Sequence, residues 1–139
     1  MHTTADCSPG AFGIELTQEE IEQFKEQGYA THMVGKWHLG GGLNGAFDRG
    51  GWTKFAGIQQ GGVPAYDNWS KFEDGLRTDN VTTYTTTDQV NEAVEFIDAQ
   101  AQNPWFVWMA FNAPHTPFHD PAPYVTPENG YSTNGTNNA

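Results

Sequence analysis

Apolar residues recur at helical spacing near the start of the chain, in a stretch bounded by typical helix signals. Thr17 and Glu20 fit a capping box, and apolar side chains follow at helical spacing. Gly28 stands where such a helix would end, because glycine readily adopts the left-handed conformation that closes helices. The pattern predicts a helix over residues 17–27, followed by a short strand over residues 30–34.

A second amphipathic stretch leads into the longest apolar run of the chain. Residues 87–102 carry apolar side chains at helical spacing, with Thr87 as the expected cap and Pro104 beyond the end. Residues 105–111 are then all apolar, which is typical of a strand buried on both faces in a parallel sheet. The alternation of helix and strand indicates an α/β fold.

The remaining segments carry no sustained helical or strand period. Residues 40–75 are rich in glycine and aromatic side chains, so we expect a long irregular segment that packs onto the rest of the domain. The chain turns to Pro, Asn, Gly, Ser and Thr near its end. We therefore expect one partial α/β domain over residues 1–125 and a disordered tail over residues 126–139.

The charge balance narrows the classes of partner. The 139 residues carry a formal net charge of −11, so we expect neither nucleic acid nor an anionic membrane surface as a ligand. We find no apolar stretch long enough to span a membrane and no signal-peptide pattern at the N-terminus. This predicts a cytosolic chain or one that begins downstream of a signal. Only six Lys and Arg are present, so each positive charge near a loop is informative.

Three basic side chains follow the two predicted strands. Lys36 and His38 stand where the first strand gives way to glycines, and on a strand they would point to the same side. His115 follows the second strand between Pro114 and Pro117, which stiffen its loop and exclude a helical zinc pair with His119. Because parallel strands bring such loops to one edge, we expect an anion site there, although a solvated lysine and structural histidines would fit the same pattern.

These motifs resemble the formylglycine-dependent sulfatases of the alkaline phosphatase superfamily. Residues 35–40 read Gly-Lys-Trp-His-Leu-Gly and are similar to the second signature of that family. Residues 111–117 read Phe-Asn-Ala-Pro-His-Thr-Pro and resemble the loop that carries a further substrate-contacting histidine. The resemblance covers roughly residues 15–125. It implies an incomplete piece of a mixed, mainly parallel sheet flanked by helices.

The resemblance also implies roles for the three basic residues in hydrolysis of a sulfate ester. Lys36 would bind sulfate oxygens and offset the charge of the transition state. His38 would hydrogen-bond the formylglycine hydrate and assist elimination of sulfate. His115 would contact the sulfate or protonate the departing alkoxide. Sulfated organic molecules or inorganic sulfate are the ligands that this comparison implies.

The chain departs from the family pattern at the nucleophile and at the metal. Cys7-Ser8-Pro9 resembles the start of the modification motif, but Ala11 stands where the family has arginine. Cys7 is therefore either a remnant of the nucleophile position or an unrelated buried thiol. The family also uses a calcium ion, and the carboxylate and amide ligands that it needs are largely missing from this sequence, so we do not assign metal ligands.

The leading interpretation is a sulfatase fragment that carries part of a sulfate-binding active site and is inactive or weakly active alone. A non-catalytic sulfate- or phosphate-binding module is the first alternative. The second is a structural remnant that self-associates through exposed aromatic side chains. A phosphoester or phosphonate hydrolase of the same superfamily is the third. Members of the family are often secreted or periplasmic, but the sequence assigns no location.

Overall fold

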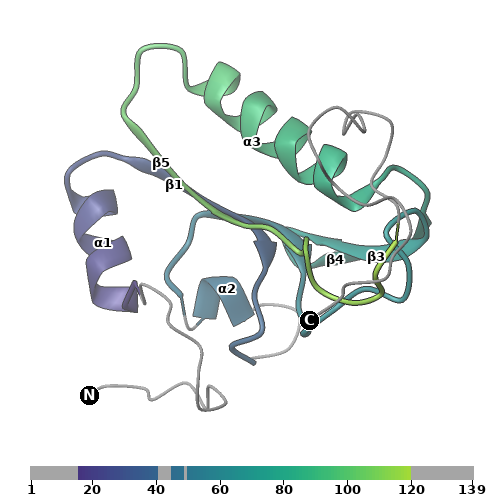
Figure 1. The fold of residues 1–139 in the computed structure, drawn as a ribbon. Coiled ribbons are helices and arrows are strands. Elements are labelled where there is room, and N and C mark those ends of the chain that lie inside the picture. Colours follow the sequence, from purple (N-terminus) through teal and green to yellow (C-terminus); the bar gives the residue numbers. More distant parts are fainter. Residues whose placement is uncertain (1–15, 41–44, 49, 120–139) are drawn as a thin grey trace.

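A computed structural model describes residues 16–40, 45–48 and 50–119 as one sheet with helices on both of its faces (Figure 1). Cys7 and the predicted tail over residues 126–139 lie outside the described residues. In chain order the elements are α1 (Gln18–Glu26), β1 (Ala30–Lys36), α2 (Gly45–Asp48), β2 (Lys54–Ile58), β3 (Trp69–Glu73), β4 (Leu76–Val81), α3 (Thr85–Gln100) and β5 (Trp105–Ala110).

The five strands lie in the order β4-β3-β2-β1-β5. β1 pairs in parallel with both β2 and β5, whereas β3 and β4 form an antiparallel hairpin attached to β2. The sheet is therefore mixed and flanked by helices, which confirms the predicted α/β class. Among the described strands, parallel and antiparallel pairings are equal in number.

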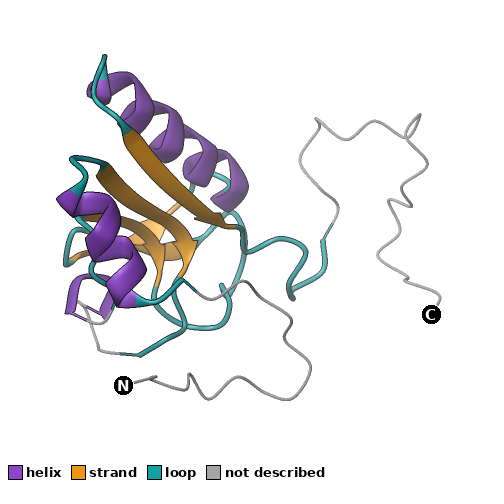
Figure 2. Cartoon of the chain, turned by 90° about the vertical axis from the view of Figure 1, so that its left-hand side faces the viewer, coloured by secondary structure: helices purple, strands orange, loops and turns teal. Residues whose placement is uncertain are grey.

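The two faces of the sheet have separate cores because side chains alternate along β1. On one face, Met33 and Phe55 pack with Ile21 of α1. On the other face, the ring of His32 lies 4.8 Å from that of Phe96 in α3. Helix α3 thus covers one face while α1 and α2 lie against the other (Figure 1 and Figure 2). No described helix has the length and apolar character needed to cross a membrane.

The first predicted helix and strand are confirmed. Thr17 and Glu20 form the expected capping box: the Thr17 hydroxyl accepts from the Glu20 backbone N–H, and the Glu20 carboxylate accepts from the Thr17 backbone N–H. Gly28 follows the helix with φ of 83° and turns the chain into β1. β1 extends two residues beyond the predicted strand and ends at Lys36.

The prediction of an irregular segment over residues 40–75 is wrong. That stretch contains α2, β2, β3 and the turn into β4. Strands β3 and β4 are largely exposed and polar, so they lack the apolar alternation by which strands are recognised. The turn between them was the readable signal: Asp74 and Gly75 both have positive φ, at 46° and 84°, as a two-residue hairpin turn of the Asp-Gly type requires.

The expected start of α3 is also wrong. The helix begins at Thr85, two residues before the predicted cap Thr87, and its N-cap Tyr84 makes no side-chain capping bond. Both the backbone N–H and the hydroxyl of Thr85 donate to the Tyr66 carbonyl, at 2.8 and 2.9 Å. A tertiary contact, rather than a local cap, therefore fixes where α3 starts.

Strand β5 occupies an edge of the described sheet, and it is not buried on both faces as predicted. It pairs with β1 alone among the described strands. Trp105 and Met109 are 42% and 37% exposed, and Phe111 just beyond the strand is 43% exposed. An entirely apolar strand therefore forms an open edge of the described sheet.

Candidate functional site

The candidate site lies at the carboxyl edge of the three parallel strands. Lys36 stands opposite Ile58, and Gly35 stands opposite both Gly57 and Ala110, so β1, β2 and β5 end at the same level. A Cβ atom added to Gly35 would overlap the Ala110 backbone, and one added to Gly57 would overlap that of Gly35. A row of small residues therefore closes the sheet beneath the loops, where ligands bind in open α/β sheets.

Lys36 is the last residue of β1 and is half-buried. Strand alternation places it on the same face of β1 as His32 and Val34, toward α3. Within the described part of the chain, its ammonium group makes no salt bridge. Lys36 thus brings a positive charge to the edge of the sheet that no described carboxylate neutralises.

His38 lies beyond the end of β1, in a left-handed turn with φ of 53°. Its backbone N–H donates to the Gln59 carbonyl at 3.0 Å, and the Trp37 indole donates to the Gly40 carbonyl at 2.7 Å. His38 thus lies in a left-handed turn beyond the strand, so strand alternation does not fix the direction of its ring, and the residue is exposed. A left-handed non-glycine residue costs conformational energy and is common at functional sites.

His115 is held by bonds on both its ring and its backbone. Its Nδ1 lies 2.9 Å from the Thr116 carbonyl oxygen and 3.2 Å from the Thr116 hydroxyl, and because a carbonyl can only accept, the shorter contact is made by the tautomer with the proton on Nδ1. The other ring nitrogen, Nε2, is then the acceptor in the neutral ring and a donor in the charged one. The Tyr66 hydroxyl donates to the His115 carbonyl at 2.8 Å, and this hydrogen bond fixes the loop to the buried Tyr66 side chain.

Two consecutive glycines of the loop after β2 bring the histidines together. A Cβ atom at Gly61 would lie 3.1 Å from Cε1 of His38, and a Cβ atom at Gly62 would lie 3.3 Å from Cε1 of His115. Neighbouring Cα atoms are about 3.8 Å apart, so the two rings border adjacent positions of one loop. The structure thus places His38 and His115 next to neighbouring positions of the loop that follows β2, the strand paired with β1.

The loop that carries His115 contacts the rest of the fold through residues that the sequence interpretation did not assign a role. The His119 ring packs on that of Tyr66 at 4.2 Å, and its Nε2 lies 2.8 Å from the Tyr84 hydroxyl. Residues 111–119 contain no helix, so His115 and His119 do not lie one turn apart on a helix, as the prolines predicted. The contacts of His119 with Tyr66 and Tyr84 depend on tertiary packing, so no local sequence pattern predicts them.

A buried amide pair ties the same loop to α3. The Gln89 side chain donates to Asn112 Oδ1 at 2.6 Å, and both residues are buried. Within the described residues, Gln89 Oε1 and Asn112 Nδ2 have no hydrogen-bond partner. Asn112 was visible only as a member of the sequence motif, and its partner could not be found from sequence spacing.

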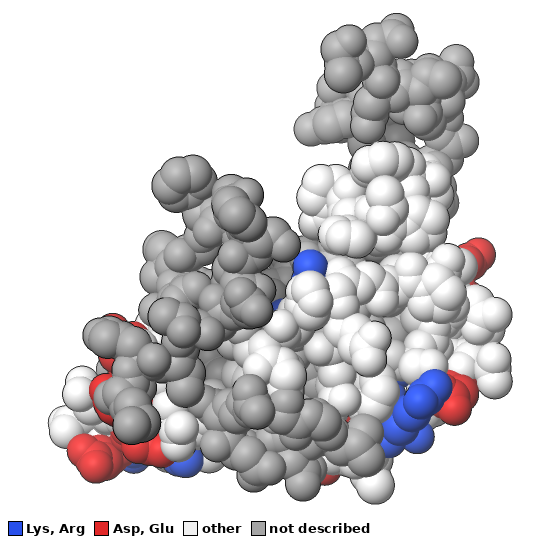
Figure 3. Space-filling model, turned by 90° about the horizontal axis from the view of Figure 1, so that it is seen from below, with Lys and Arg blue, Asp and Glu red and all other residues white. Residues whose placement is uncertain are grey.

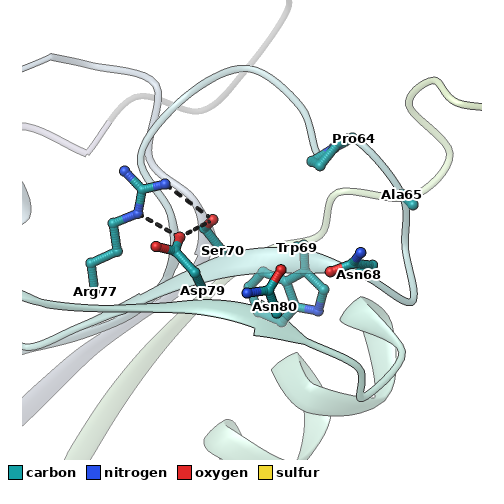
Figure 4. Close-up of a pocket in the computed structure, with 8 residues that line it drawn as sticks. All are labelled: Pro64, Ala65, Asn68, Trp69, Ser70, Arg77, Asp79 and Asn80. Carbon is teal, nitrogen blue, oxygen red and sulfur yellow. Dashed lines mark hydrogen bonds and ion pairs between the residues drawn. The ribbon is translucent and has the colours of Figure 1, made fainter.

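An open hollow of about 480 Å³ lies on the hairpin side of the loop that contains the two glycines (Figure 4). Asp79 Oδ1 accepts from the Ser70 hydroxyl at 2.6 Å and from Arg77 Nε at 2.7 Å. These two hydrogen bonds lower the pKa of Asp79, that from Ser70 most. Asn68 and Asn80 add amide groups to the lining. The hollow therefore offers hydrogen-bonding groups of both kinds to a polar ligand.

Comparison with known proteins identifies the family. A family model described as Sulfatase matches residues 19–139. The chain belongs to the sulfatase family. An arylsulfatase of Klebsiella aerogenes is 30% identical over 86% of this chain and 30% of its own length. An N-acetylgalactosamine-6-sulfatase of Canis lupus familiaris is 30% identical over 78% of this chain and 24% of its own length. The resemblance inferred from the motifs is thereby confirmed, and the chain spans less than a third of these sulfatases.

Solved structures show the same sulfatase-like fold. The crystal structure of Ps i-CgsB in complex with k-i-k-neocarrahexaose has a TM-score of 0.61 at 23% identity, over 76% of this chain and 29% of that one. The structure of BT4656 in complex with its substrate D-glucosamine-2-N,6-O-disulfate has a TM-score of 0.55 at 24% identity, over 76% of this chain and 20% of that one. These likenesses establish the mixed sheet and its helices.

The described part of this sulfatase chain does not fit the calcium ion that the family suggests. No group of three or more His, Cys, Asp or Glu side chains within it is arranged to hold a metal ion. Figure 3 shows acidic and basic side chains at the margins of one face and a further basic group near its middle, within otherwise uncharged described surface. The candidate site within the described residues consists of one lysine and two histidines, and we derive no step through calcium.

Proposed function

We propose that this chain supplies the sulfate-gripping and proton-transferring part of a sulfatase active site. One observation carries the proposal: His38 and His115 border adjacent glycines of one loop, at the sheet edge where Lys36 ends β1. Their proximity comes from two loops separated by about half the chain. Two histidines with unrelated structural roles would not be expected to border neighbouring positions of one loop.

Each residue then has a role that its chemistry supports. Lys36 binds sulfate oxygens as a fixed positive charge and stabilises the charge that grows on them. His115 holds its Nδ1 proton on the Thr116 carbonyl, so a proton on Nε2 is the one available to the departing alkoxide. His38, with its backbone fixed by Gln59 and its ring exposed, is placed to exchange a proton on the other side of the sulfate.

The nucleophile is the finer part of the proposal. Cys7 is the single cysteine of the chain and hence its one candidate for conversion to formylglycine. That group, when present, supplies the hydroxyl that attacks sulfur in the family. Cys7 lies outside the described residues, so the roles of Lys36, His38 and His115 stand independently of it. Because the described residues do not fit the calcium ion of the family, we expect weak turnover or none from this chain alone.

Sulfated sugars are the class of substrate that we propose. The printed names of the relatives support this: N-acetylgalactosamine-6-sulfatase is named for a sugar, and the two structures hold k-i-k-neocarrahexaose and D-glucosamine-2-N,6-O-disulfate. The hollow beside the glycine loop carries amide, hydroxyl, carboxylate and guanidinium groups, which suit sugar hydroxyls (Figure 4).

Calorimetry with inorganic sulfate tests whether the site binds sulfate, and this measurement does not require catalysis. Replacing Lys36 by Met should weaken sulfate binding by about tenfold or more, because a charged hydrogen bond contributes about 1.5–3 kcal/mol. Lys54→Met is the matched control, since Lys54 is also near a strand end but is paired with Asp74 and 54% exposed. Equal binding by both variants would refute the assignment of Lys36.

An aryl sulfate assay, with and without added calcium, tests catalysis. Turnover that disappears in His38→Ala would show that the chain is competent alone. Sulfate binding without turnover, together with an unmodified mass at Cys7, would identify a binding module that lacks the nucleophile. Absence of both binding and turnover would refute the proposed function.

A further inference from the structure

We infer that Gly61 and Gly62 are positioning residues that set the spacing between the two histidines. The inference rests on the proposed function for its purpose, because it explains how two separate loops present their rings to one sulfate. It assigns a role to a loop that contributes neither charge nor proton to the reaction. The two glycines contribute by having no side chain, because a side chain at either position would approach a histidine ring too closely.

Backbone conformation does not explain why glycine stands at these two positions. Six described glycines have positive φ, and neither Gly61 nor Gly62 is among them. An alanine could therefore adopt the same backbone without strain. Close approach is the remaining reason: the three atoms nearest to a Cβ at Gly61 would all belong to the His38 ring, with Cε1 at 3.1 Å, Nε2 at 3.3 Å and Nδ1 at 3.6 Å.

The second glycine has the same relation to the other histidine. A Cβ at Gly62 would lie 3.3 Å from both Cε1 and Nδ1 of His115, and 3.7 Å from the Thr116 carbonyl oxygen. The ring nearest to Gly61 is therefore that of His38, and the ring nearest to Gly62 is that of His115. A substitution at one of the two glycines should therefore act mainly on the histidine nearest to it.

The loop is better fixed than the rings that it borders. Val63 and Tyr66 are buried in the core cluster at its far end, and the Gln59 carbonyl is bonded to the His38 backbone at its near end. His38 and His115 have exposed side chains. A methyl group added to the loop should therefore displace a ring by a few tenths of an ångström and leave the loop in place.

The test uses Gly61→Ala and Gly62→Ala in the full chain, with Gln60→Ala as the control. Gln60 belongs to the same loop and is exposed. The readout is the set of histidine ring Cε1–H signals in carbon–proton correlation spectra, assigned with single His→Gln variants. We expect Gly61→Ala to shift the His38 signal more than that of His115, and Gly62→Ala to show the reverse, with both signals unchanged in Gln60→Ala.

Sulfate affinity provides the second readout. Each glycine variant should bind inorganic sulfate about threefold to tenfold more weakly than the wild type, because misplacement by about 1 Å can cost a factor of 100 in a preorganised site and the expected displacement is smaller. The Gln60→Ala variant should bind as the wild type does. Binding that is unaffected in both glycine variants would contradict the positioning role.

The two inferences fail in different ways. If the wild-type chain does not bind sulfate, the proposed function is wrong, while the ring signals still report whether each glycine positions its histidine. If sulfate binds but the two variants shift both histidines equally or neither, the positioning inference is wrong. Unfolding of either variant would also overturn the positioning inference. The added methyl group would then clash with fixed parts of the fold and not only with a histidine ring that can move.

Discussion

Two lysines of the sheet use their positive charges in opposite ways. Lys71 of β3 is only 12% exposed and lies within ion-pair distance of Asp88 at 3.1 Å, Glu73 at 3.7 Å and, closer still, Glu92. Lys36 ends β1 at the carboxyl edge and has no carboxylate partner in the described chain. The charge of Lys71 joins the β3–β4 hairpin to α3, whereas the charge of Lys36 remains available to an anion.

The local environment of Lys71 shows why its charge is retained. Burial lowers the pKa of its ammonium group, but hydrogen bonds with Glu92 and Asp88 outweigh burial and raise the pKa overall. Burial likewise raises the pKa of Asp88, which the contact with Lys71 only partly offsets. The difference between the lysines teaches that sequence position alone does not identify an anion-binding lysine. The two lysines differ in the carboxylates that face them: Lys71 has three within ion-pair distance, and Lys36 has none among the described residues.

The largest effect is expected when Lys71 is replaced. Lys71→Met leaves Asp88 and Glu92 without their partner at the contact between β3 and α3, and removing one member of a buried pair costs about 3 kcal/mol. Urea denaturation at pH 7 measures the loss. Lys54→Met, which breaks an exposed pair with Asp74, should cost about 0.5 kcal/mol or less. Equal losses of stability in the two variants would contradict the expected difference between a buried and an exposed lysine ion pair.

Replacing Lys36 should produce the complementary result. Lys36→Met removes no described ion pair, so the free energy of unfolding should change by about 0.5 kcal/mol or less. The sulfate affinity, in contrast, should fall by about tenfold or more. Denaturation and calorimetry on the same preparation measure both quantities. A large loss of stability with unchanged sulfate binding would mean that Lys36 is a structural residue like Lys71.

A histidine on the same strand extends the comparison from charge to protonation. His32 is buried against Phe96, and within the described residues its Nδ1 has no partner. Burial lowers its pKa below the usual 6.5, and a backbone hydrogen bond with Lys54 offsets this only in part. The unfolded chain therefore takes up the proton first as pH falls through 6.5, so folded stability decreases toward lower pH.

Denaturation at pH 7.5 and pH 5.5 measures this contribution. The wild type should lose about 1 kcal/mol more than His32→Leu between the two pH values, since one pKa unit corresponds to about 1.4 kcal/mol. The variant controls for the carboxylates, which titrate in both chains. Parallel losses in wild type and variant would show that His32 is not held in its neutral form.

The smallest effect is expected at the open edge of the sheet. Trp105 and Phe111 are exposed on and beside β5, and we predict weak self-association through these aromatic side chains. Sedimentation across a range of protein concentrations should show it in wild type and in Lys36→Met. The double variant Trp105→Ser, Phe111→Ser should sediment as a monomer at all concentrations, and a monomeric wild type would refute the prediction.

Sequence reasoning recovered the elements whose pattern is local. The capping box at Thr17 and the helical spacing after Thr87 identified α1 and most of α3. The same reasoning failed for β3 and β4, because exposed polar strands have no apolar alternation, and only the Asp74-Gly75 turn marked them. It also failed for the start of α3, which the Tyr66 carbonyl determines from 19 residues away.

The site divides in the same manner. The motifs named Lys36, His38 and His115 as candidates, but their spacing along the chain does not show that the histidines meet. Their proximity depends on Gly61 and Gly62, which follow β2, a strand that the sequence did not reveal. Strand alternation was likewise a poor guide to His38, since a left-handed residue lies outside the strand.

The row of small residues across β1, β2 and β5 limits how this edge of the protein can evolve. Gly35 and Gly57 leave no room for a side chain between adjacent backbones, so the floor beneath the loops cannot be reshaped one substitution at a time. Adaptation to a new ligand has to proceed through the loops that begin after these strands. Libraries aimed at altered ligand preference should accordingly diversify the loops and leave the row invariant.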